Sequence, residues 1–184
     1  MPDPTFAQPA RSPILPLLIA AGVLALIAAG VFYFNPHDTA SLSLSNTSVV
    51  PTQTTFKSQS IVVGEGASTQ DDLYVFTTLK VDDHLRLPIT INTITASLIT
   101  GDNQESATSA ISKSDLPAIF IAFPKLKPLA APPLLRETTI APGQSAEGQL
   151  VFHFPVPKST WDTRKSATIT LDLYHQTPQT IVIP

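Results

Sequence analysis

Histidines, aspartates and serines are the side chains of this chain that could do acid–base, metal or nucleophilic chemistry. No two of the four histidines stand two, three or four residues apart, so their spacing predicts no local metal site. Alternation places His153 on the opposite side of its segment from Phe152 and Phe154, and we expect it to face solvent. The other three histidines are His37, His84 and His175.

The most closely spaced acids form two adjacent pairs, Asp71 with Asp72 and Asp82 with Asp83, at the two ends of one strand-like segment. At about 3.3 Å per strand residue the pairs lie about 30 Å apart. A pair of glycosidase carboxylates requires a separation of roughly 10 Å or less. The D-x-D-x-D-G spacing of a calcium loop is also absent. We therefore expect these aspartates to be solvated acids in turns.

No nucleophile or cofactor motif accompanies these residues. The stretch 143–147 (GQSAE) comes nearest to a G-x-S-x-G motif, but it lacks the second glycine and precedes a strand pattern rather than a helix. The chain has no cysteine, which excludes disulfides and thiolate chemistry. Its net charge is -3, whereas a nucleic-acid binder typically carries an excess of basic residues. We therefore expect no catalytic, cofactor-binding or metal-ligating residue, no cofactor, no nucleic-acid partner and no enzymatic activity.

Residues Ile14–Phe34 form an uninterrupted apolar run, ILPLLIAAGVLALIAAGVFYF. At about 1.5 Å per residue, a helix of this length spans about 30 Å, the thickness of the hydrocarbon core of a bilayer. The run therefore predicts a single transmembrane helix, because a buried core helix would show a polar face. A cleaved signal peptide is the alternative, with Ala28 and Gly30 as the small residues before the cut, but signal peptides have shorter apolar runs.

The charges that flank this run predict its orientation. Arg11 and the terminal amine precede it, Asp38 is the first charge after it, and Lys57 is the first later cation. The positive-inside rule then places residues 1–13 in the cytoplasm and the C-terminal part outside the membrane, in the periplasm of a Gram-negative cell. Residues 35–55 are rich in serine and threonine, and we expect a tether that runs into an edge strand.

Beyond residue 56 apolar and polar residues alternate with period two, as is typical of strands. A change of parity near Asn92 indicates a bulge or a break between two strands. Pro142 and Gly143 occupy the second and third corners of a type II turn, which we expect to be a corner between two sheets. Strands are expected at 61–63, 73–81, 85–98, 150–154, 169–173 and 181–183.

Three segments depart from this alternation. Residues 114–123 (SDLPAIFIAF) carry an N-cap residue and an early proline, so they favour a short helix from Ser114 or Asp115, with a buried strand as the alternative. The proline-studded stretch 124–137 is expected to cross the outside of the domain as an extended loop. Trp161, the single tryptophan, is expected to be half-buried at an edge.

The order of these segments resembles the immunoglobulin-like domains of single-pass bacterial envelope proteins of unassigned function. In those domains a late strand opens with Pro-Gly, which is followed by a small or polar stretch, a Gly and an apolar-x-Phe element. The matching residues here are Pro142, Gly143, Gly148, Leu150 and Phe152. The likeness covers residues 56–184. It implies an all-β fold, an immunoglobulin-like antiparallel β-sandwich of about seven to nine strands with one short helix.

We therefore expect a membrane-anchored extracytoplasmic domain with a non-catalytic binding or assembly role, such as an accessory subunit of an envelope complex. Its partners would be the lipid bilayer, through Ile14–Phe34, and another envelope protein that contacts a sandwich edge or residues 116–136. One alternative is an envelope hydrolase or metal-dependent enzyme whose site brings His84 or His175 to carboxylates only in three dimensions. The other is a carbohydrate-binding or adhesive module, for which Trp161 and Tyr174 are the exposed aromatic candidates.

Overall fold

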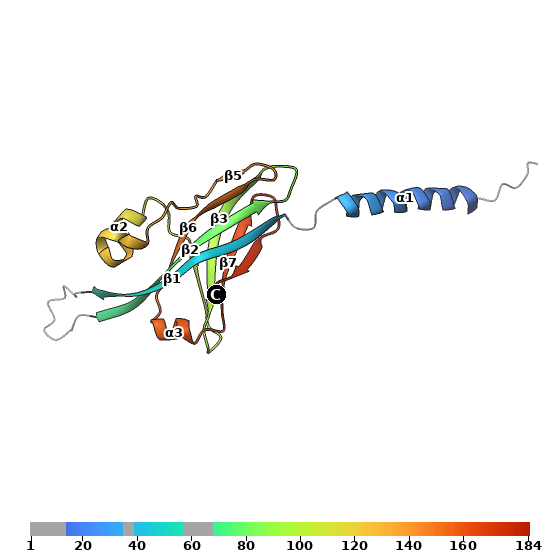
Figure 1. The fold of residues 1–184 in the computed structure, drawn as a ribbon. Coiled ribbons are helices and arrows are strands. Elements are labelled where there is room, and N and C mark those ends of the chain that lie inside the picture. Colours follow the sequence, from blue (N-terminus) through green and yellow to red (C-terminus); the bar gives the residue numbers. More distant parts are fainter. Residues whose placement is uncertain (1–13, 35–38, 57–67) are drawn as a thin grey trace, which may run out of the picture. The chain divides into compact units, whose positions relative to one another are not determined.

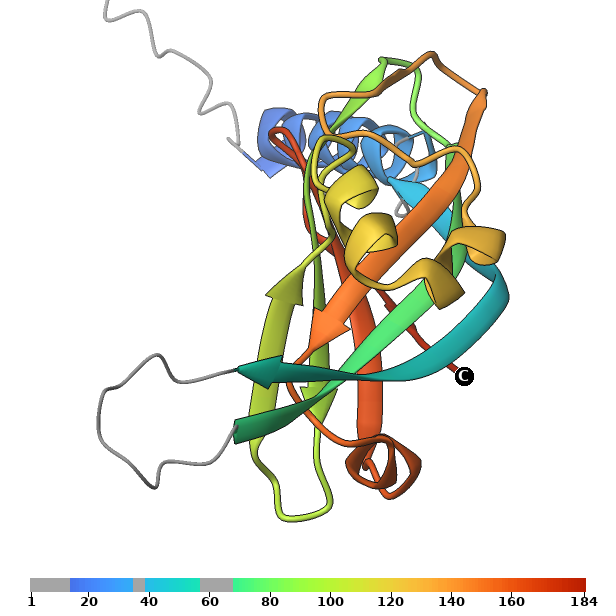
Figure 2. The same ribbon diagram turned by 90° about the vertical axis from the view of Figure 1, so that its left-hand side faces the viewer.

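The structure, a computed structural model, describes residues 14–34, 39–56 and 68–184 (Figures 1 and 2). The chain divides into two compact units, Met1–His37 and Asp38–Pro184. The predicted cytoplasmic segment 1–13 and the predicted strand at 61–63 lie outside the described residues.

The first unit contains one helix, α1 (Ile14–Phe34). Its sequence has no charged residue, and none of it is buried within the described part of the protein. Helix α1 is long and apolar enough to cross a membrane. A core helix of a soluble domain would bury at least one face, so this exposure sets α1 apart from the helices of the second unit.

The second unit consists of two antiparallel sheets. The first has the order β1-β2-β6, and the second has the order β4-β3-β7-β8, with β5 paired to β3. The described strands are β1 (Ala40–Phe56), β2 (Ser68–Asp83), β3 (Ile89–Ile99), β4 (Glu105–Ser109), β5 (Thr139–Ile140), β6 (Ser145–Phe154), β7 (Ser166–Leu173) and β8 (Gln179–Val182).

The two sheets share one apolar core. Because side chains alternate along a strand, every second residue of β2 and β6 points to the same side, where it meets alternate residues of β3 and β7. The predicted alternation at 73–81, 150–154 and 169–173 is confirmed. Buried members of this core are Leu73, Val75, Leu79, Val81, Ile91, Ile94, Leu98, Leu150, Phe152, Phe154, Ile169 and Leu171.

The change of parity near Asn92 is a bulge within one continuous strand. Strand β3 pairs with β7 from Ile91 opposite Leu173 onward, and its register shifts between Ile91 and Thr93. The extra residue reverses which side chains point inward, so Ile91 and Ile94 both reach the core. The bulge that the sequence indicated is confirmed, and the alternative of two separate strands is not.

The predicted turn at 141–144 is a corner between the sheets. The backbone N–H of Gln144 donates to the carbonyl of Ala141 at 2.9 Å, and Gly143 has a φ of 67°. A positive φ at the third corner is what a type II turn requires. The turn carries the chain from β5, which pairs with β3, to β6, which pairs with β2.

Most of the segment expected to be a tether is strand. Strand β1 begins at Ala40 opposite Asp83 and reaches Phe56 opposite Ser68, with a register shift between Ser45 and Ser48. The compact unit accordingly starts at Asp38 rather than at residue 56. Ala40, Leu42 and Leu44 of β1 pack against the main core, and serine and threonine predominate in the rest of this edge strand.

Residues 114–123 form the expected helix, α2 (Leu116–Ala122), with Asp115 at its N-cap. Asp115 makes no capping bond with its side chain, which accepts a hydrogen bond from the hydroxyl of Ser112 instead. The following stretch differs from the expected extended loop, because Pro124–Leu129 form the 3-10 helix η1. A further helix that the sequence did not reveal, α3 (Lys158–Asp162), places Trp161 in the core at 3% exposure rather than half-buried.

Candidate functional site

The sheet β1-β2-β6 is covered on both faces. The side chains of Tyr74, Phe76 and Val151 point away from the main core and form a second apolar cluster. Leu116 of α2 and Leu126 of η1 are the buried residues that close this cluster from the other side. The sheet therefore lies between the second sheet and the α2–η1 segment, and polar residues of its second face can be buried.

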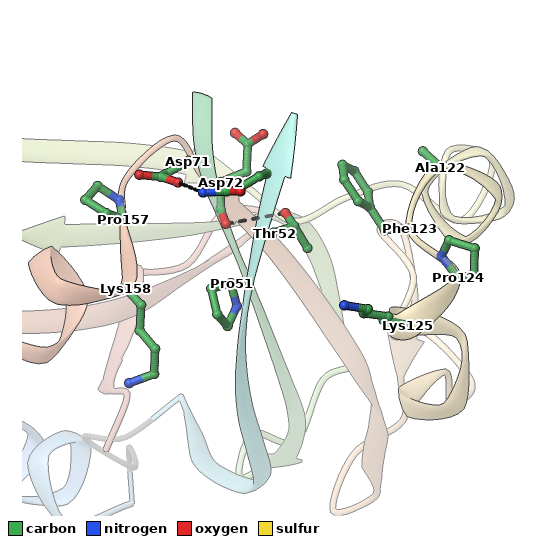
Figure 3. A pocket seen from close by; sticks show the side chains of 11 residues that line it. Pro51, Thr52, Asp71, Asp72, Ala122, Phe123, Pro124, Lys125, Pro157 and Lys158 are labelled. Carbon is green, nitrogen blue, oxygen red and sulfur yellow. Dashed lines mark hydrogen bonds between the residues drawn. The ribbon is translucent and has the colours of Figure 1, made fainter. Parts of the chain in front are cut away.

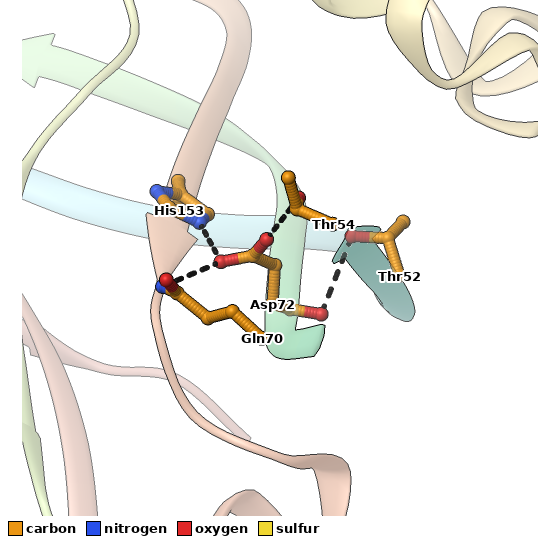
Figure 4. Close-up of polar contacts among 5 residues, drawn as sticks. All are labelled: Thr52, Thr54, Gln70, Asp72 and His153. Atoms are coloured by element: carbon orange, nitrogen blue, oxygen red, sulfur yellow. Dashed lines mark hydrogen bonds and ion pairs between the residues drawn. The ribbon is translucent and has the colours of Figure 1, made fainter. Parts of the chain in front are cut away.

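Asp72 is the centre of a polar network at the end of this face (Figure 4). Only 5% of Asp72 is exposed. Its Oδ1 lies 2.7 Å from Nε2 of His153 and accepts a hydrogen bond of 3.3 Å from Nε2 of Gln70, while its Oδ2 accepts one from the hydroxyl of Thr54. The prediction of a solvated Asp72 is therefore wrong, because its carboxylate is enclosed by Thr54, Gln70 and His153. His153 still faces solvent in part, as predicted, with 37% of its side chain exposed.

Tyr74 packs between this network and the α2–η1 segment. Its ring stacks on His153, with the centroids 5.0 Å apart, and meets the ring of Phe123 at 5.5 Å. Burial raises the pKa of the Tyr74 phenol above its ordinary value, and the negative charge of Asp72 raises that pKa further. Both causes favour the neutral phenol in the folded protein.

Substituting phenylalanine for Tyr74 is expected to weaken the loss of stability at alkaline pH. Because the pKa of Tyr74 is raised by folding, this group's contribution to stability is complete below its ordinary pKa of 10.0 and is lost as the pH rises through the raised value. Between about pH 9 and about pH 11, Tyr74→Phe should lose less unfolding free energy in urea titrations than the unsubstituted protein. The exposed Tyr174 provides the control, and equal losses in Tyr74→Phe and Tyr174→Phe would contradict the assignment.

A pocket of about 670 Å³ opens beside Asp72 (Figure 3). Figure 3 shows Phe123, Pro124 and Lys125 on one side of it and Pro157 and Lys158 on the other, with the β1–β2 ribbon between them. The full lining is Pro51, Thr52, Gln53, Asp71, Asp72, Ala122, Phe123, Pro124, Lys125, Pro157 and Lys158. The site thus combines proline and aromatic walls with carboxylates and two ammonium groups.

An acid–imidazole pair lies beside the pocket, because Asp72 lines it and contacts His153. Asp72 faces Nε2 of His153 and so orients the imidazole, as the acid of a catalytic triad would. Within the described ranges, however, no serine or threonine hydroxyl is hydrogen-bonded to the ring of His153, so the pair lacks the third member of a triad. Lys158 is held by Asp162 at 2.7 Å, whereas Lys125 has no hydrogen bond or ion pair among the residues that the structure describes.

The other residues singled out from the sequence do not converge. In the part of the chain that the structure covers, no three histidine or acidic side chains are placed to hold a metal ion. His84 lies at the surface, with Nε2 3.3 Å from the hydroxyl of Ser41, and His175 lies in the exposed turn after β7. Trp161 is buried against Phe154, so it is not an exposed stacking platform. His37 is outside the described residues.

Asp82 and Asp83 differ from each other. Asp82 forms an ion pair with Lys80 at 2.7 Å, as a surface acid would. Asp83 is buried: its Oδ1 accepts a hydrogen bond of 2.7 Å from the backbone N–H of Leu85, which starts the turn after β2. Its Oδ2 has no partner among the described residues. The prediction of a solvated turn acid is wrong for Asp83, which is 3% exposed and whose backbone N–H donates to the carbonyl of Gln144 in the corner at 141–144.

Sequence reasoning missed the Asp72–His153 pair because the two residues meet through the pairing of β2 with β6, in which Tyr74 is opposite His153. One signal was available. Asp72 shares its parity with Tyr74 and Phe76, whereas Leu73 and Val75 have the other parity, and large apolar residues on both parities of one strand indicate a strand buried on both faces.

Comparison with known proteins gives structural likeness alone. No protein-family model matches the chain, and no curated protein matches it. The yjhA protein from Bacillus subtilis is 13% identical over 72% of this chain and 74% of its own, with a TM-score of 0.41. A functionally unknown protein from Listeria monocytogenes is 10% identical over 82% of this chain and 79% of its own, with a TM-score of 0.42. An uncharacterized β-sandwich protein from Clostridium difficile is 8% identical over 81% of this chain and 88% of its own, with a TM-score of 0.37.

Proposed function

We propose that this protein is a single-pass, membrane-anchored binding domain that stands outside the cytoplasm and serves as an accessory subunit of an envelope complex. The observation that carries the proposal is α1, an apolar helix of 21 residues in whose apolar span no residue is buried in the described protein. An exposed apolar surface of this kind needs an apolar environment, and a bilayer supplies one. Arg11 before the helix, with no cation after it until Lys57, supports a cytoplasmic N-terminus.

We further propose that the second unit is an immunoglobulin-like sandwich. The strand order supports this assignment, because β1, β2 and β6 share one sheet while β3, β7 and β8 share the other. In an immunoglobulin sandwich strands A, B and E are likewise separated from strands C, F and G. The corner at 141–144, which leads from one sheet to the other, corresponds to the Pro-Gly element on which the resemblance was based.

The contact surface for a protein partner is, on this proposal, the cap surface, which consists of residues 116–129 of α2, Phe123 and η1. Ile121 projects from it with 81% of its surface exposed, an unusual degree for a large apolar side chain in a folded domain. Lys125 and Lys127 follow in η1, and residues 116–129 contain no acidic side chain. A partner with an apolar anchor surrounded by acidic residues would complement this surface.

A photo-crosslinking amino acid at position 121, introduced into the full-length protein in its own cells, tests the proposal. After irradiation and an alkaline carbonate wash, the protein should stay in the membrane pellet and carry one discrete protein adduct. The same probe at Gln104, in the exposed turn between β3 and β4, should give none. Release of the protein into the wash would refute the anchor. An adduct that survives Lys125→Glu with Lys127→Glu, or that also forms at position 104, would refute the cap surface.

A further inference from the structure

Two connections at the end of the second unit where β1 begins carry three exposed side chains. Leu87, in the connection between β2 and β3, is 73% exposed, and Tyr174, in the turn after β7, is 44% exposed. Arg86 precedes Leu87 and has no hydrogen bond or ion pair with any residue that the structure describes. We call Arg86, Leu87 and Tyr174 the loop patch.

Backbone hydrogen bonds hold these two connections at one end of the sheets. The N–H of Tyr174 donates to the carbonyl of Thr90 at 3.0 Å, which fixes the turn after β7 beside the start of β3. Leu85 packs against the main core, so the β2–β3 connection is anchored before it turns outward at Leu87. The patch is therefore a fixed feature of the fold.

The same end is joined to the apolar helix by a short piece of chain. The N–H of His84 donates to the carbonyl of Thr39 at 3.2 Å, and Ala40 is opposite Asp83 at the start of β1. Thr39 follows Phe34 by about five residues, and a chain of that length spans at most about 17 Å even when fully extended. If α1 ends at the interface, the start of β1 is within this distance of the membrane surface.

The chemistry of the loop patch fits a lipid headgroup layer. Tyrosine is enriched at membrane interfaces, an exposed leucine gains free energy by entering the acyl boundary, and an unpaired arginine is attracted to anionic headgroups. The nearest acids oppose this only weakly, since Asp82 is paired with Lys80 and Asp83 is buried. Glu137 is exposed near the start of β3 and has a cation beside it in the chain, Arg136.

We propose that the loop patch inserts into the headgroup layer of an anionic bilayer. This inference depends on the proposed membrane anchor but not on the proposed protein partner. The occupant is an anionic lipid surface, which the cation, the leucine and the tyrosine of the patch contact together.

Because the chain has no cysteine, single-cysteine fluorescent labels can test the inference on the full-length protein. The protein would be reconstituted in phosphatidylcholine vesicles with and without phosphatidylglycerol, with nitroxide-headgroup lipid as quencher. A label at Gln176, in the same turn as Tyr174, should be quenched about threefold more strongly than a label at Gln104. Leu87→Ser should remove most of that difference, and omission of phosphatidylglycerol or Arg86→Gln should reduce it.

Two controls separate contact with lipid from mere proximity. Val182→Ser removes another exposed apolar side chain, 63% exposed, from β8, away from the patch, and should leave the quenching at position 176 unchanged. If Leu87→Ser also leaves the quenching at position 176 unchanged, the short chain between α1 and β1 alone accounts for the quenching, and the inference is refuted. A label at Leu24, read with acyl-chain nitroxides, reports on the anchor itself. If the label at Leu24 is not quenched, the membrane anchor and the inference are both refuted. If the label at Leu24 is quenched but the label at Gln176 is quenched no more than the label at Gln104, only the inference is refuted.

Discussion

Gly148→Ala is expected to lower the free energy of unfolding by about 3 kcal/mol, which corresponds to a fall in Tm of roughly 10 °C for a domain of this size. A β-carbon at this position would lie 2.7 Å from Cα and 2.9 Å from Cβ of Leu134, and it would also overlap the backbone nitrogen of that residue. Backbone atoms cannot yield as the end of a flexible side chain can. The segment that contains Leu134 would therefore have to move away from β6.

That movement would break the contacts that fasten this segment to the sheet. The N–H of Gln149 donates to the carbonyl of Pro132 at 2.8 Å, and the N–H of Leu134 donates to the carbonyl of Gln149 at 3.0 Å. The side-chain amide of Gln149 donates to the carbonyl of Leu129 and accepts from the N–H of Ala131. Each such bond contributes about 0.5–1.5 kcal/mol, so their loss would add to the steric cost.

Gly101→Ala is the matched control for this prediction. A β-carbon there would meet only the carbonyl oxygen of Thr163, at 3.3 Å, and a shift of a few tenths of an ångström in the neighbouring turn relieves this contact. Thermal unfolding followed by circular dichroism compares the two variants. If Gly148→Ala were no less stable than Gly101→Ala, the close approach of residues 132–134 to β6 would not exist.

Asp72→Ala is expected to cost about 3 kcal/mol in urea unfolding, even though Asp72 lies at the edge of a pocket. The carboxylate is almost fully buried and is the shared acceptor for His153, Gln70 and Thr54. Removing it leaves the hydroxyl of Thr54 and the ring nitrogen of His153 without their partner. Burying an unsatisfied polar group costs about 1–3 kcal/mol.

Asp71 is the control for Asp72, because it is the preceding residue and has the same chemistry. Its carboxylate is exposed and accepts one hydrogen bond, of 2.9 Å, from the amide of Gln53. Asp71→Ala should therefore change the unfolding free energy by less than about 0.5 kcal/mol. Similar losses in the two variants would show that Asp72 is not the buried centre of the network.

Most of the main sheet structure could be predicted because its signals are local. Alternation at 73–81 and 150–154 follows directly from which side chains a strand points inward. The parity change at Asn92 and the Pro142–Gly143 pair each mark a backbone geometry that few other residues support. These features depend on neighbours in the chain, so a single sequence carries them.

The features that could not be predicted depend on residues far apart in the chain. Strand β1 is defined by its pairing with β2, and its apolar alternation is confined to Ala40, Leu42 and Leu44, after which the strand is mostly polar. The second face of β2 carries Tyr74 and Phe76, and nothing near them in the sequence reveals that α2 and η1 cover it. The pair of Asp72 and His153, which are 81 residues apart in the chain, follows from the register of β2 with β6.

The enclosure of β2 has a consequence for how this protein can diversify. Between Leu73 and Leu79 the strand has a neighbour on each edge, the second sheet on one face and α2–η1 on the other. A substitution in this segment changes the packing against several neighbouring elements at once, so most substitutions would destabilise the domain and be removed by selection. Novel specificities would instead arise in the peripheral connections, where residues such as Ile121 and Leu87 can vary without disturbing the layers beneath them.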